Sequence, residues 1–251
     1  MAVAKLARTA PSPQATCTPI SCKKCGVYQL CVPLGVDGTD LALLESIVKR
    51  KEVYKRGQVL FRPGERFDCI YALRSGSVKT SVISADGRVQ IAGFHVAGEL
   101  LGLSAYASGQ YSCEATALET ISVCKVEVER LDQLAKTMPS IYFEMLKISS
   151  EQIRRDEELM LLLGTRRAEE RLAEYLIGLS RRFASRNYSA TQFRLSMSRK
   201  DIGSYLGMAE ETVSRILARF QEDGCISIAH REVHLNDLDR LSAIARNAGN
   251  V

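Results

Sequence analysis

The sequence lacks any long run of apolar residues, and this absence bears on where the protein works. No stretch of its 251 residues approaches the ~18 uncharged apolar residues that a membrane-spanning helix needs. The opening residues, MAVAKLARTAPSPQATCTP, also lack the continuous apolar segment of a secretory signal peptide. We therefore expect a cytoplasmic protein with no membrane partner.

Histidine is scarce, and the residue groups of common catalytic sites are missing. The three histidines, His95, His230 and His234, are too scattered in the sequence to be preferred metal ligands. There is no glycine-rich nucleotide-binding loop and no acid–base constellation. The sequence therefore argues against an enzyme, and an iron–sulfur oxidoreductase is the enzymatic alternative.

Cysteine, in contrast, is plentiful, with eight residues in the chain. In a reducing cytoplasm, clustered cysteines more often bind metal or carry out redox chemistry than form structural disulfides. The net charge of +5 is a mild indication of a polyanionic partner. Composition alone therefore leaves the function open between several kinds of intracellular binding protein.

Short β-rich segments separated by glycine-containing turns fill the first half of the chain. Their regular spacing predicts a β-sandwich or roll that runs to about Glu129. Ahead of them, Leu41, Leu44, Ile47 and Val48 recur at helical spacing and predict a helix over residues 40–51. The expected strands are 59–61, 69–73, 77–82 and 90–94, with closing strands within 115–126.

A long helix is expected after Pro139, because proline suits the first helical turn, where its missing N–H donor is not needed. Residues along this helix repeat with the seven-residue period of a coiled coil. We interpret them as a homodimer contact that includes Ile153, Asp156 and Met160, the alternative being a helix buried on its own β-roll. The seam is Tyr142, Leu146, Ser149, Ile153, Asp156, Met160 and Leu163.

Asp156 is the unusual member of this seam. In a two-fold dimer it would approach its own copy or apolar neighbours, which is unfavourable. Such a residue makes dimerisation marginal, as a switch requires. The alternative is that Asp156 turns to solvent or pairs with Arg155.

The most specific pattern for function lies between Ser196 and Phe220. It predicts two short helices around a tight turn, with Ser198 as N-cap and Gly207 in the left-handed conformation. The pattern is typical of a helix-turn-helix, and residues 225–229 and 232–235 predict a two-stranded wing.

The outward face of the second helix carries groups that can read DNA. Arg215 can donate to guanine, Glu211 can accept from a cytosine amino group, and Ser214 can contact a base. Phosphate contacts are expected from Thr212, Ser198 and Arg199.

Against DNA binding, similar helix pairs occur in proteins that bind none. Residues 196–251 hold seven Lys or Arg and eight Asp or Glu, so phosphate attraction must rely on the seven arginines of residues 165–195.

Three thiols lie within ten residues in the pattern Cys22-x2-Cys25-x5-Cys31. Thiolates suit both zinc and iron–sulfur clusters, so a structural four-cysteine zinc site is the main alternative to a cluster. Cys69 lies in an apolar segment that predicts a core position. The possible fourth ligands, which spacing cannot separate, are Cys17, Cys69, Cys113, Cys124 and Cys225.

Taken together, the periodicities predict an α+β fold. The expected units are a disordered tail at 1–16, a cysteine-rich segment at 17–34, a β-roll domain at 35–138, a dimerisation helix at 139–164 and a winged helix-turn-helix domain at 165–251.

From about Cys17 to Asp239 the sequence resembles the FNR family, the fumarate-and-nitrate-reduction regulators, within the cyclic-AMP receptor protein superfamily. The motifs that carry the resemblance are Cys22-x2-Cys25-x5-Cys31-x-Pro33, Gly57-x2-Leu60-Phe61, Gly93-Phe94-His95-x2-Gly98-Glu99-Leu100, Ala117-Leu118-Glu119-Thr120 with Cys124, Ala168-Glu169-Glu170-Arg171-Leu172, and Glu211-Thr212-Val213-Ser214-Arg215.

The resemblance implies a [4Fe–4S] cluster that oxygen converts to [2Fe–2S] and then destroys, loosening the dimer. Its ligands would be Cys22, Cys25, Cys31 and Cys124. The resemblance also implies a global regulator of anaerobic metabolism genes that acts on double-stranded DNA.

The same resemblance implies that Glu211, Ser214 and Arg215 read an inverted repeat similar to TTGAT-N4-ATCAA. RNA polymerase would be contacted through exposed roll loops such as residues 85–87.

Residues 101–119 contain no Arg or Lys, although a cyclic phosphate bound in the roll would need a cation there. We therefore expect no cyclic nucleotide to bind. The alternative is a regulator of the same superfamily with a zinc site or a different effector.

Overall fold

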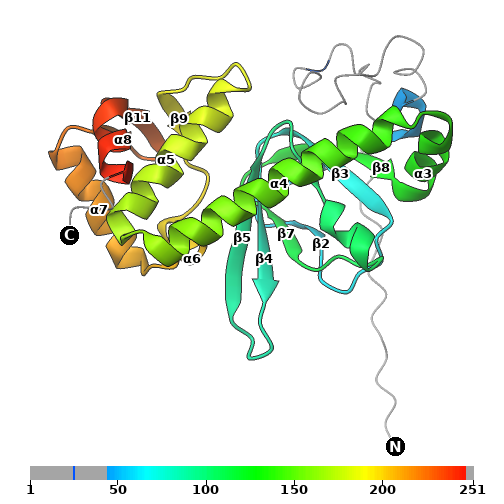
Figure 1. Cartoon of the computed structure of the whole chain (residues 1–251), viewed down its shortest axis with the longest axis horizontal. Coiled ribbons are helices and arrows are strands. Elements are labelled where there is room, and N and C mark those ends of the chain that lie inside the picture. Colours follow the sequence, from blue (N-terminus) through cyan, green and yellow to red (C-terminus); the bar gives the residue numbers. More distant parts are fainter. Residues whose placement is uncertain (1–24, 26–43, 247–251) are drawn as a thin grey trace, which may run out of the picture.

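The computed structural model describes residue 25 and residues 44–246. Two folded units are joined by one long helix, which crosses the front of the molecule in Figure 1. Of the expectations above, those on Cys17, Cys22, Cys31, the tail at 1–16 and the helix start at residue 40 lie outside the described residues.

The first unit is a β-roll made of two antiparallel four-stranded sheets, with strand orders β1-β8-β3-β6 and β2-β7-β4-β5. The turns between consecutive strands from β1 to β6 each contain a glycine with positive φ, and the β4–β5 hairpin projects from the roll (Figure 1). The strands are β1 Val48–Tyr54, β2 Val59–Phe61, β3 Cys69–Ser75, β4 Ser77–Ile83, β5 Val89–Val96, β6 Leu100–Leu101, β7 Glu114–Ala117 and β8 Ile121–Glu127, with the 3-10 helix η2 at Leu103–Ala107.

The predicted helix over residues 40–51 is wrong in its second half. Residues 44–47 are helical, but β1 begins at Val48, which pairs with Val126 of β8. The apolar spacing fits a helix, whereas the β-branched residues from Val48 onward find a strand partner almost 80 positions away. Local periodicity carries no information about such a partner.

Two helices follow the roll. Helix α3, Val128–Thr137, packs Leu131, Leu134 and Ala135 into the roll core, and it was absent from the sequence-based expectation. Helix α4, Ser140–Thr165, begins directly after Pro139, which confirms the prediction for the long helix. Ile141 is the only residue of α4 that is fully buried within the described chain.

The second unit is a winged helix-turn-helix, as predicted. Residues Leu172, Tyr175, Leu176 and Leu179 of α5 are buried in the core of this unit. A third wing strand, β9, pairs with β11 and was not predicted. The elements are α5 Ala168–Ala184, β9 Gln192–Arg194, α6 Arg199–Leu206, α7 Glu210–Glu222, β10 Ile226–Ala229, β11 Glu232–Leu235 and α8 Leu238–Arg246.

Each unit has its own hydrophobic core, but the second core does not stop at the unit boundary. Ile91, Phe94 and Leu118 of the roll belong to the same buried cluster as the core of the helix-turn-helix unit. The two units are therefore in direct apolar contact. Across the described part of the chain, none of the helices has the length and apolarity of a membrane span.

Candidate nucleic-acid interface and sensor cysteines

The helix-turn-helix is built by local capping at its first helix. The Ser198 hydroxyl accepts from the Asp201 backbone N–H at 3.0 Å, and the Asp201 carboxylate accepts from the Ser198 N–H at 3.1 Å. This reciprocal capping box begins α6, and it confirms Ser198 as the N-cap.

Two glycines shape the turn between α6 and α7. Gly207 ends α6 with φ of 62°, as predicted, and this left-handed conformation costs glycine little. Gly203 has a different role, since a Cβ there would lie 2.6 Å from the Met208 carbonyl oxygen. The absence of a side chain at Gly203 is what allows the chain to return so closely over α6.

Arg171 braces this turn from α5, a role that sequence reasoning missed. Its guanidinium donates to the carbonyl oxygens of Leu206 at 2.7 Å and Gly207 at 3.3 Å. These are the carbonyls that the end of α6 leaves without partners. The position of Arg171, 35 residues before Leu206, gave no local signal of this contact.

The recognition helix α7 has one buried and one open face. Val213, Ile216, Leu217 and Phe220 form its buried face. The predicted base-reading residues all lie on the solvent side, where each is exposed: Glu211, Ser214 and Arg215.

The expected phosphate-contacting residues differ in how available they are. Thr212 and Arg199 are half-buried, and burial lowers the pKa of Arg199 below its ordinary value. The Ser198 hydroxyl is already engaged in capping, since it also donates to Asp201 at 2.7 Å.

The described cysteines lie in different environments. Cys25 and Cys124 are both half-buried. Cys225 is fully buried in the core of the DNA-binding unit, and burial raises the pKa of Cys113, which packs against the roll core. No group of three or more metal-ligating side chains occurs within residue 25 and residues 44–246, and Cys22 and Cys31 lie outside these residues.

Strand pairing separates Cys69 from Cys124. Cys124 on β8 lies opposite Ala72 on β3, and Cys69 precedes Ala72 by three residues. Because side chains alternate along a strand, Cys69 and Cys124 lie on opposite faces of the sheet. Cys69 shares its face with Tyr71 and Leu73 and packs against the roll core, consistent with the position expected for it.

Aromatic rings occupy the interior of the roll. Phe61 and Tyr111 stack with centroids 4.0 Å apart, and the Tyr111 hydroxyl donates to the Cys69 carbonyl at 2.5 Å. Tyr71 is buried beside them and donates to the Leu60 carbonyl at 3.3 Å.

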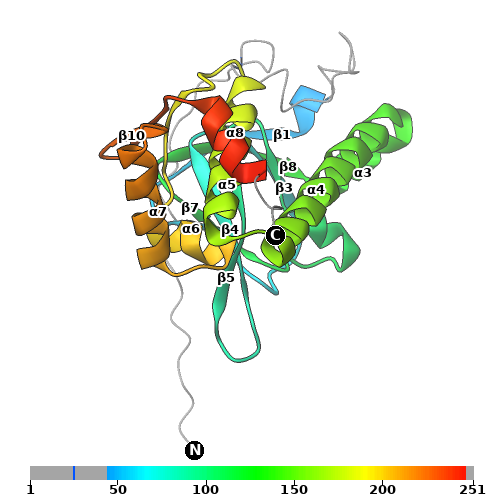
Figure 2. The same ribbon diagram turned by 60° about the vertical axis from the view of Figure 1, so that its left-hand side comes forward.

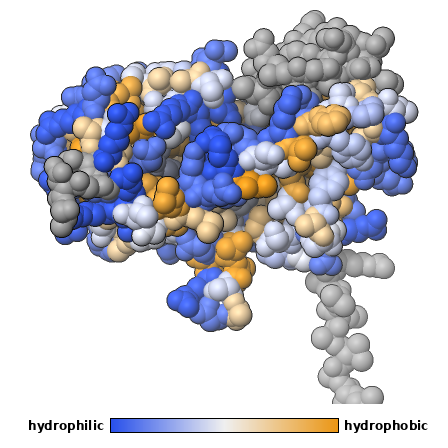
Figure 3. Space-filling model, viewed as in Figure 1, coloured by the Kyte–Doolittle hydropathy of each residue, from blue (hydrophilic) through white to orange (hydrophobic). Residues whose placement is uncertain are grey.

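The face of α4 away from the roll is apolar and open. Ile153 is 58% exposed and Met160 is 72% exposed, and Tyr142 and Leu146 of the same seam are exposed as well. Apolar patches follow the course of α4 across the front of the molecule in Figure 3, and Figure 2 shows α4 along one side of it. Asp156, also exposed, accepts from the Gln152 side-chain amide at 2.8 Å, and partial burial raises its pKa.

Each of the two units is similar to a known domain family. Residues 51–138 match the cyclic nucleotide-binding domain, and residues 170–244 match the Crp-like helix-turn-helix domain. Among solved structures, FixK2 from Bradyrhizobium japonicum is 30% identical with a TM-score of 0.72, covering 79% of this chain and 98% of that one.

Curated relatives match over most of their length. The transcriptional activator protein Anr of Pseudomonas protegens is 47% identical over 89% of this chain and 92% of its own. The fumarate and nitrate reduction regulatory protein of Salmonella typhi is 42% identical over 92% of this chain and 93% of its own length. The chain therefore belongs to the FNR family within the cyclic-AMP receptor protein superfamily, and it is a DNA-binding transcription regulator rather than an enzyme.

Proposed function

We propose that the protein is an oxygen-responsive, cytoplasmic regulator that binds an inverted repeat similar to TTGAT-N4-ATCAA as a homodimer and controls anaerobic metabolism genes. The observation that carries the proposal is the open face of α7, where Glu211, Ser214 and Arg215 are exposed in the order that the family resemblance requires. Arg215 donates to guanine and Glu211 accepts from cytosine, while Ser214 makes an additional base contact.

Phosphate contacts fix the register of this reading. Thr212 lies on α7, while Ser198 and Arg199 lie at the start of α6, whose N-terminal N–H groups favour an anion. These contacts position the recognition helix without themselves reading sequence.

The sensor in this proposal is a [4Fe–4S] cluster held by Cys22, Cys25, Cys31 and Cys124. Four thiolates form a donor set that suits such a cluster. Of the four described cysteines beyond Cys25, only Cys124 is not packed into an apolar core, which supports it as the fourth ligand. When bound, the cluster would be the group that reacts with oxygen.

The homodimer in this proposal forms through α4. The exposed seam residues Ile153 and Met160 would pack against the same residues of a second copy. Such a dimer sets two copies of α7 about one DNA turn apart, ~34 Å. Losing one of them removes half of the base contacts, so a change in dimerisation is enough to switch binding.

Two further parts of the proposal concern partners. RNA polymerase would contact the exposed tip of the β4–β5 hairpin, where Asp86 and Arg88 pair at 2.6 Å. Cyclic nucleotides would not bind, because residues 101–119 lack a cation and Phe61, Tyr71 and Tyr111 fill the roll interior. Calorimetry that detects micromolar binding of cyclic AMP would contradict this last point.

Anaerobic purification followed by footprinting tests the function. We expect iron and sulfide in the wild-type protein and protection of the inverted repeat that one exposure to air abolishes. Cys124→Ser should lose both, whereas Cys113→Ser should keep both. Zinc without iron, with binding unaffected by air, would instead identify a regulator of the alternative kind.

A further inference from the structure

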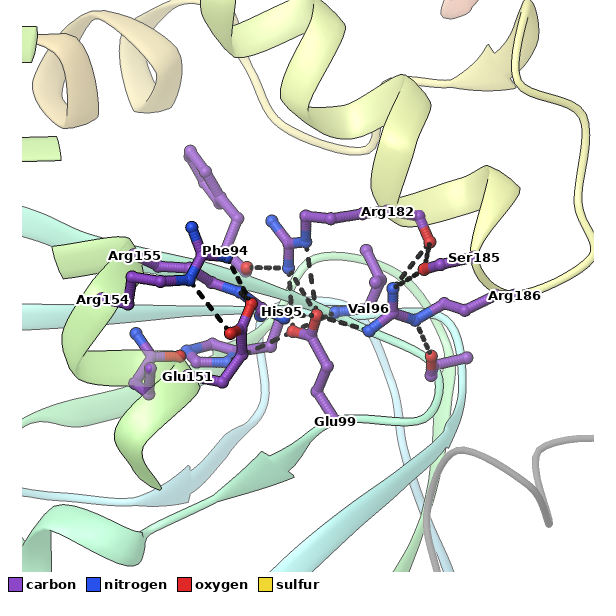
Figure 4. Close-up of polar contacts among 12 residues, drawn as sticks. Phe94, His95, Val96, Glu99, Glu151, Arg154, Arg155, Arg182, Ser185 and Arg186 are labelled. Atoms are coloured by element: carbon purple, nitrogen blue, oxygen red, sulfur yellow. Dashed lines mark hydrogen bonds and ion pairs between the residues drawn. The ribbon is translucent and has the colours of Figure 1, made fainter. Parts of the chain in front are cut away.

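One buried carboxylate joins the roll, the long helix and the DNA-binding unit. Glu99, at the end of the β5–β6 turn, accepts from Nη2 of Arg182, in the last turn of α5, at 2.8 Å and from Nη2 of Arg186, two residues past the end of α5, at 2.7 Å. Arg155 of α4 approaches the same carboxylate at 3.4 Å. Figure 4 shows these side chains converging on Glu99 from the three elements.

The arginines also hold the backbone of the roll. Arg182 donates to the Phe94 carbonyl at 2.6 Å, and Arg186 donates to the Ala97 carbonyl at 2.8 Å. Arg186 donates in addition to the Arg182 carbonyl at 2.6 Å near the end of α5. The end of α5 is therefore fastened to the roll by both charge and backbone contacts.

The cluster is buried enough for these contacts to be strong. The side chains of Glu99 and Arg186 are 10% and 7% exposed. Burial by itself raises the pKa of Glu99, but Arg182 and the other cations hold it below its ordinary value, so the carboxylate is charged. His95, 3.6 Å from Glu99, has a pKa lowered to about 4 by burial and is neutral.

A second set of contacts lies along the same boundary. Lys79 of β4 pairs with Asp201 of α6 at 2.6 Å, and the Ile91 N–H donates to the Ser204 hydroxyl at 3.0 Å. The ring of Phe94 contacts those of Tyr175 and Tyr205, with centroids 6.0 and 5.1 Å away.

This arrangement leaves the reading face free. Glu211, Ser214 and Arg215 are exposed while α5 and α6 are docked on the roll, so docking and DNA reading are compatible.

We propose that Glu99 is a positioning residue that fixes the orientation of the DNA-binding unit relative to α4, and thereby the spacing between half-sites that the dimer accepts. The proposal rests on the function proposed above, because half-site spacing has meaning only for a dimer on an inverted repeat. A change of one base pair in the spacer rotates a half-site by about 34°. A fastened unit cannot follow this rotation, whereas a loosened unit can.

The first test measures the fastening without DNA. In full-length protein purified anaerobically, Glu99→Gln should speed amide hydrogen exchange in β5 and at the end of α5. Arg181→Gln is the matched control, because Arg181 lies on the same helix but pairs with Glu174 at the surface, with its side chain 67% exposed. Unchanged exchange in Glu99→Gln would overturn the proposal.

The second test measures spacing. Wild-type protein and Arg181→Gln should bind the N4 repeat at least ~10-fold more tightly than N3 or N5 repeats, a typical cost of losing good base contacts. Glu99→Gln should bring the three affinities within about 3-fold of one another. If exchange rises but the N4 preference persists, Glu99 is a structural residue and the positioning role is wrong.

The two tests also separate this proposal from the proposed function. If wild-type protein binds none of the three DNAs, the proposed function fails, and the exchange measurement alone decides whether Glu99 fastens the unit. If Glu99→Gln does not fold, Arg155→Gln replaces it, because Arg155 is the most exposed of the three cations and makes the longest contact.

Discussion

The Lys79 ammonium of β4 lies 2.6 Å from Asp201 Oδ1 in the first turn of α6. The pair joins two residues 122 positions apart and links the roll to the helix-turn-helix. Burial raises the pKa of Asp201, but the hydrogen bonds from Lys79 and Ser198 outweigh it, and the net pKa lies below the ordinary value. The same carboxylate thus serves the cap of α6 and the contact between units.

Replacing Lys79 by methionine should lower the free energy of unfolding by about 1–3 kcal/mol at neutral pH, since the pair is mostly buried and charge-assisted. Because the folded pKa of Asp201 is lowered, its stabilisation is present above the ordinary carboxyl pKa and is lost as pH falls through the folded pKa. The difference between wild-type and Lys79→Met should therefore shrink in acid. A double-mutant cycle with Asp201→Asn isolates the pair; a coupling near zero would contradict this account.

His95 should make stability fall as pH decreases below neutrality. Its folded pKa of about 4 lies below the unfolded value of 6.5, because burial disfavours the charged ring. Between these two pKa values the unfolded chain binds a proton that the folded chain does not. The contribution of neutral His95 to the free energy of unfolding is therefore fully present above pH 6.5 and falls by up to about 3 kcal/mol towards pH 4. Urea unfolding at several pH values gives the slope of the free energy of unfolding against pH, which reports how many protons are taken up on unfolding. This slope should be smaller for His95→Gln than for wild type, by the equivalent of up to one proton. Equal slopes would mean that His95 is not buried as a neutral ring.

Two glycine-to-alanine substitutions should have opposite effects. At Gly203 the new Cβ would meet the Met208 carbonyl at 2.6 Å, so the turn must shift and stability should fall by about 1–3 kcal/mol. At Gly178, inside α5, nothing lies within 4 Å, and alanine should add about 0.5–1 kcal/mol through helix propensity. Thermal unfolding of both variants checks the pair, and a stable Gly203→Ala would show that the turn can adapt.

Asp156→Ala should strengthen dimerisation of protein that contains no iron. Bringing Asp156 close to its own copy costs free energy, and removing about 1.4 kcal/mol of that cost tightens the dimer about tenfold. Sedimentation equilibrium measures the change. Glu157→Ala is the control, since Glu157 is exposed on α4 but lies outside the seam. An unchanged dissociation constant for Asp156→Ala would refute the role of Asp156 in the seam.

The sequence was most informative where the determinants are local. Ser198 and Gly207 mark the ends of α6, and Pro139 marks the start of α4, because caps and prolines act within a few residues of themselves. The helix expected through residue 51 failed for the opposite reason, since the strand at Val48 depends on Val126.

The contacts between units could not be predicted. Glu99 and Arg182 are 83 positions apart, and an arginine-rich helix is usually a solvated surface or an electrostatic feature. The arginines of residues 165–195 are expected from the sequence to attract phosphate, whereas Arg171, Arg182 and Arg186 donate hydrogen bonds within the protein. That Cys69 and Cys124 lie on opposite faces of the sheet likewise follows only from the strand register, which the cysteine spacing does not contain.

The hydrophobic core that Ile91, Phe94 and Leu118 share with the helix-turn-helix unit limits how this protein can be recombined. A DNA-binding unit separated from the roll at residue 165 would expose the apolar surface that the roll covers in the whole protein. Its exposed apolar residues would have to be replaced by polar ones to keep the unit soluble. Exchange of modules between relatives should therefore succeed only when the matching surface of β5 travels with the helices. The β-roll and the helix-turn-helix unit are therefore expected to change together among relatives.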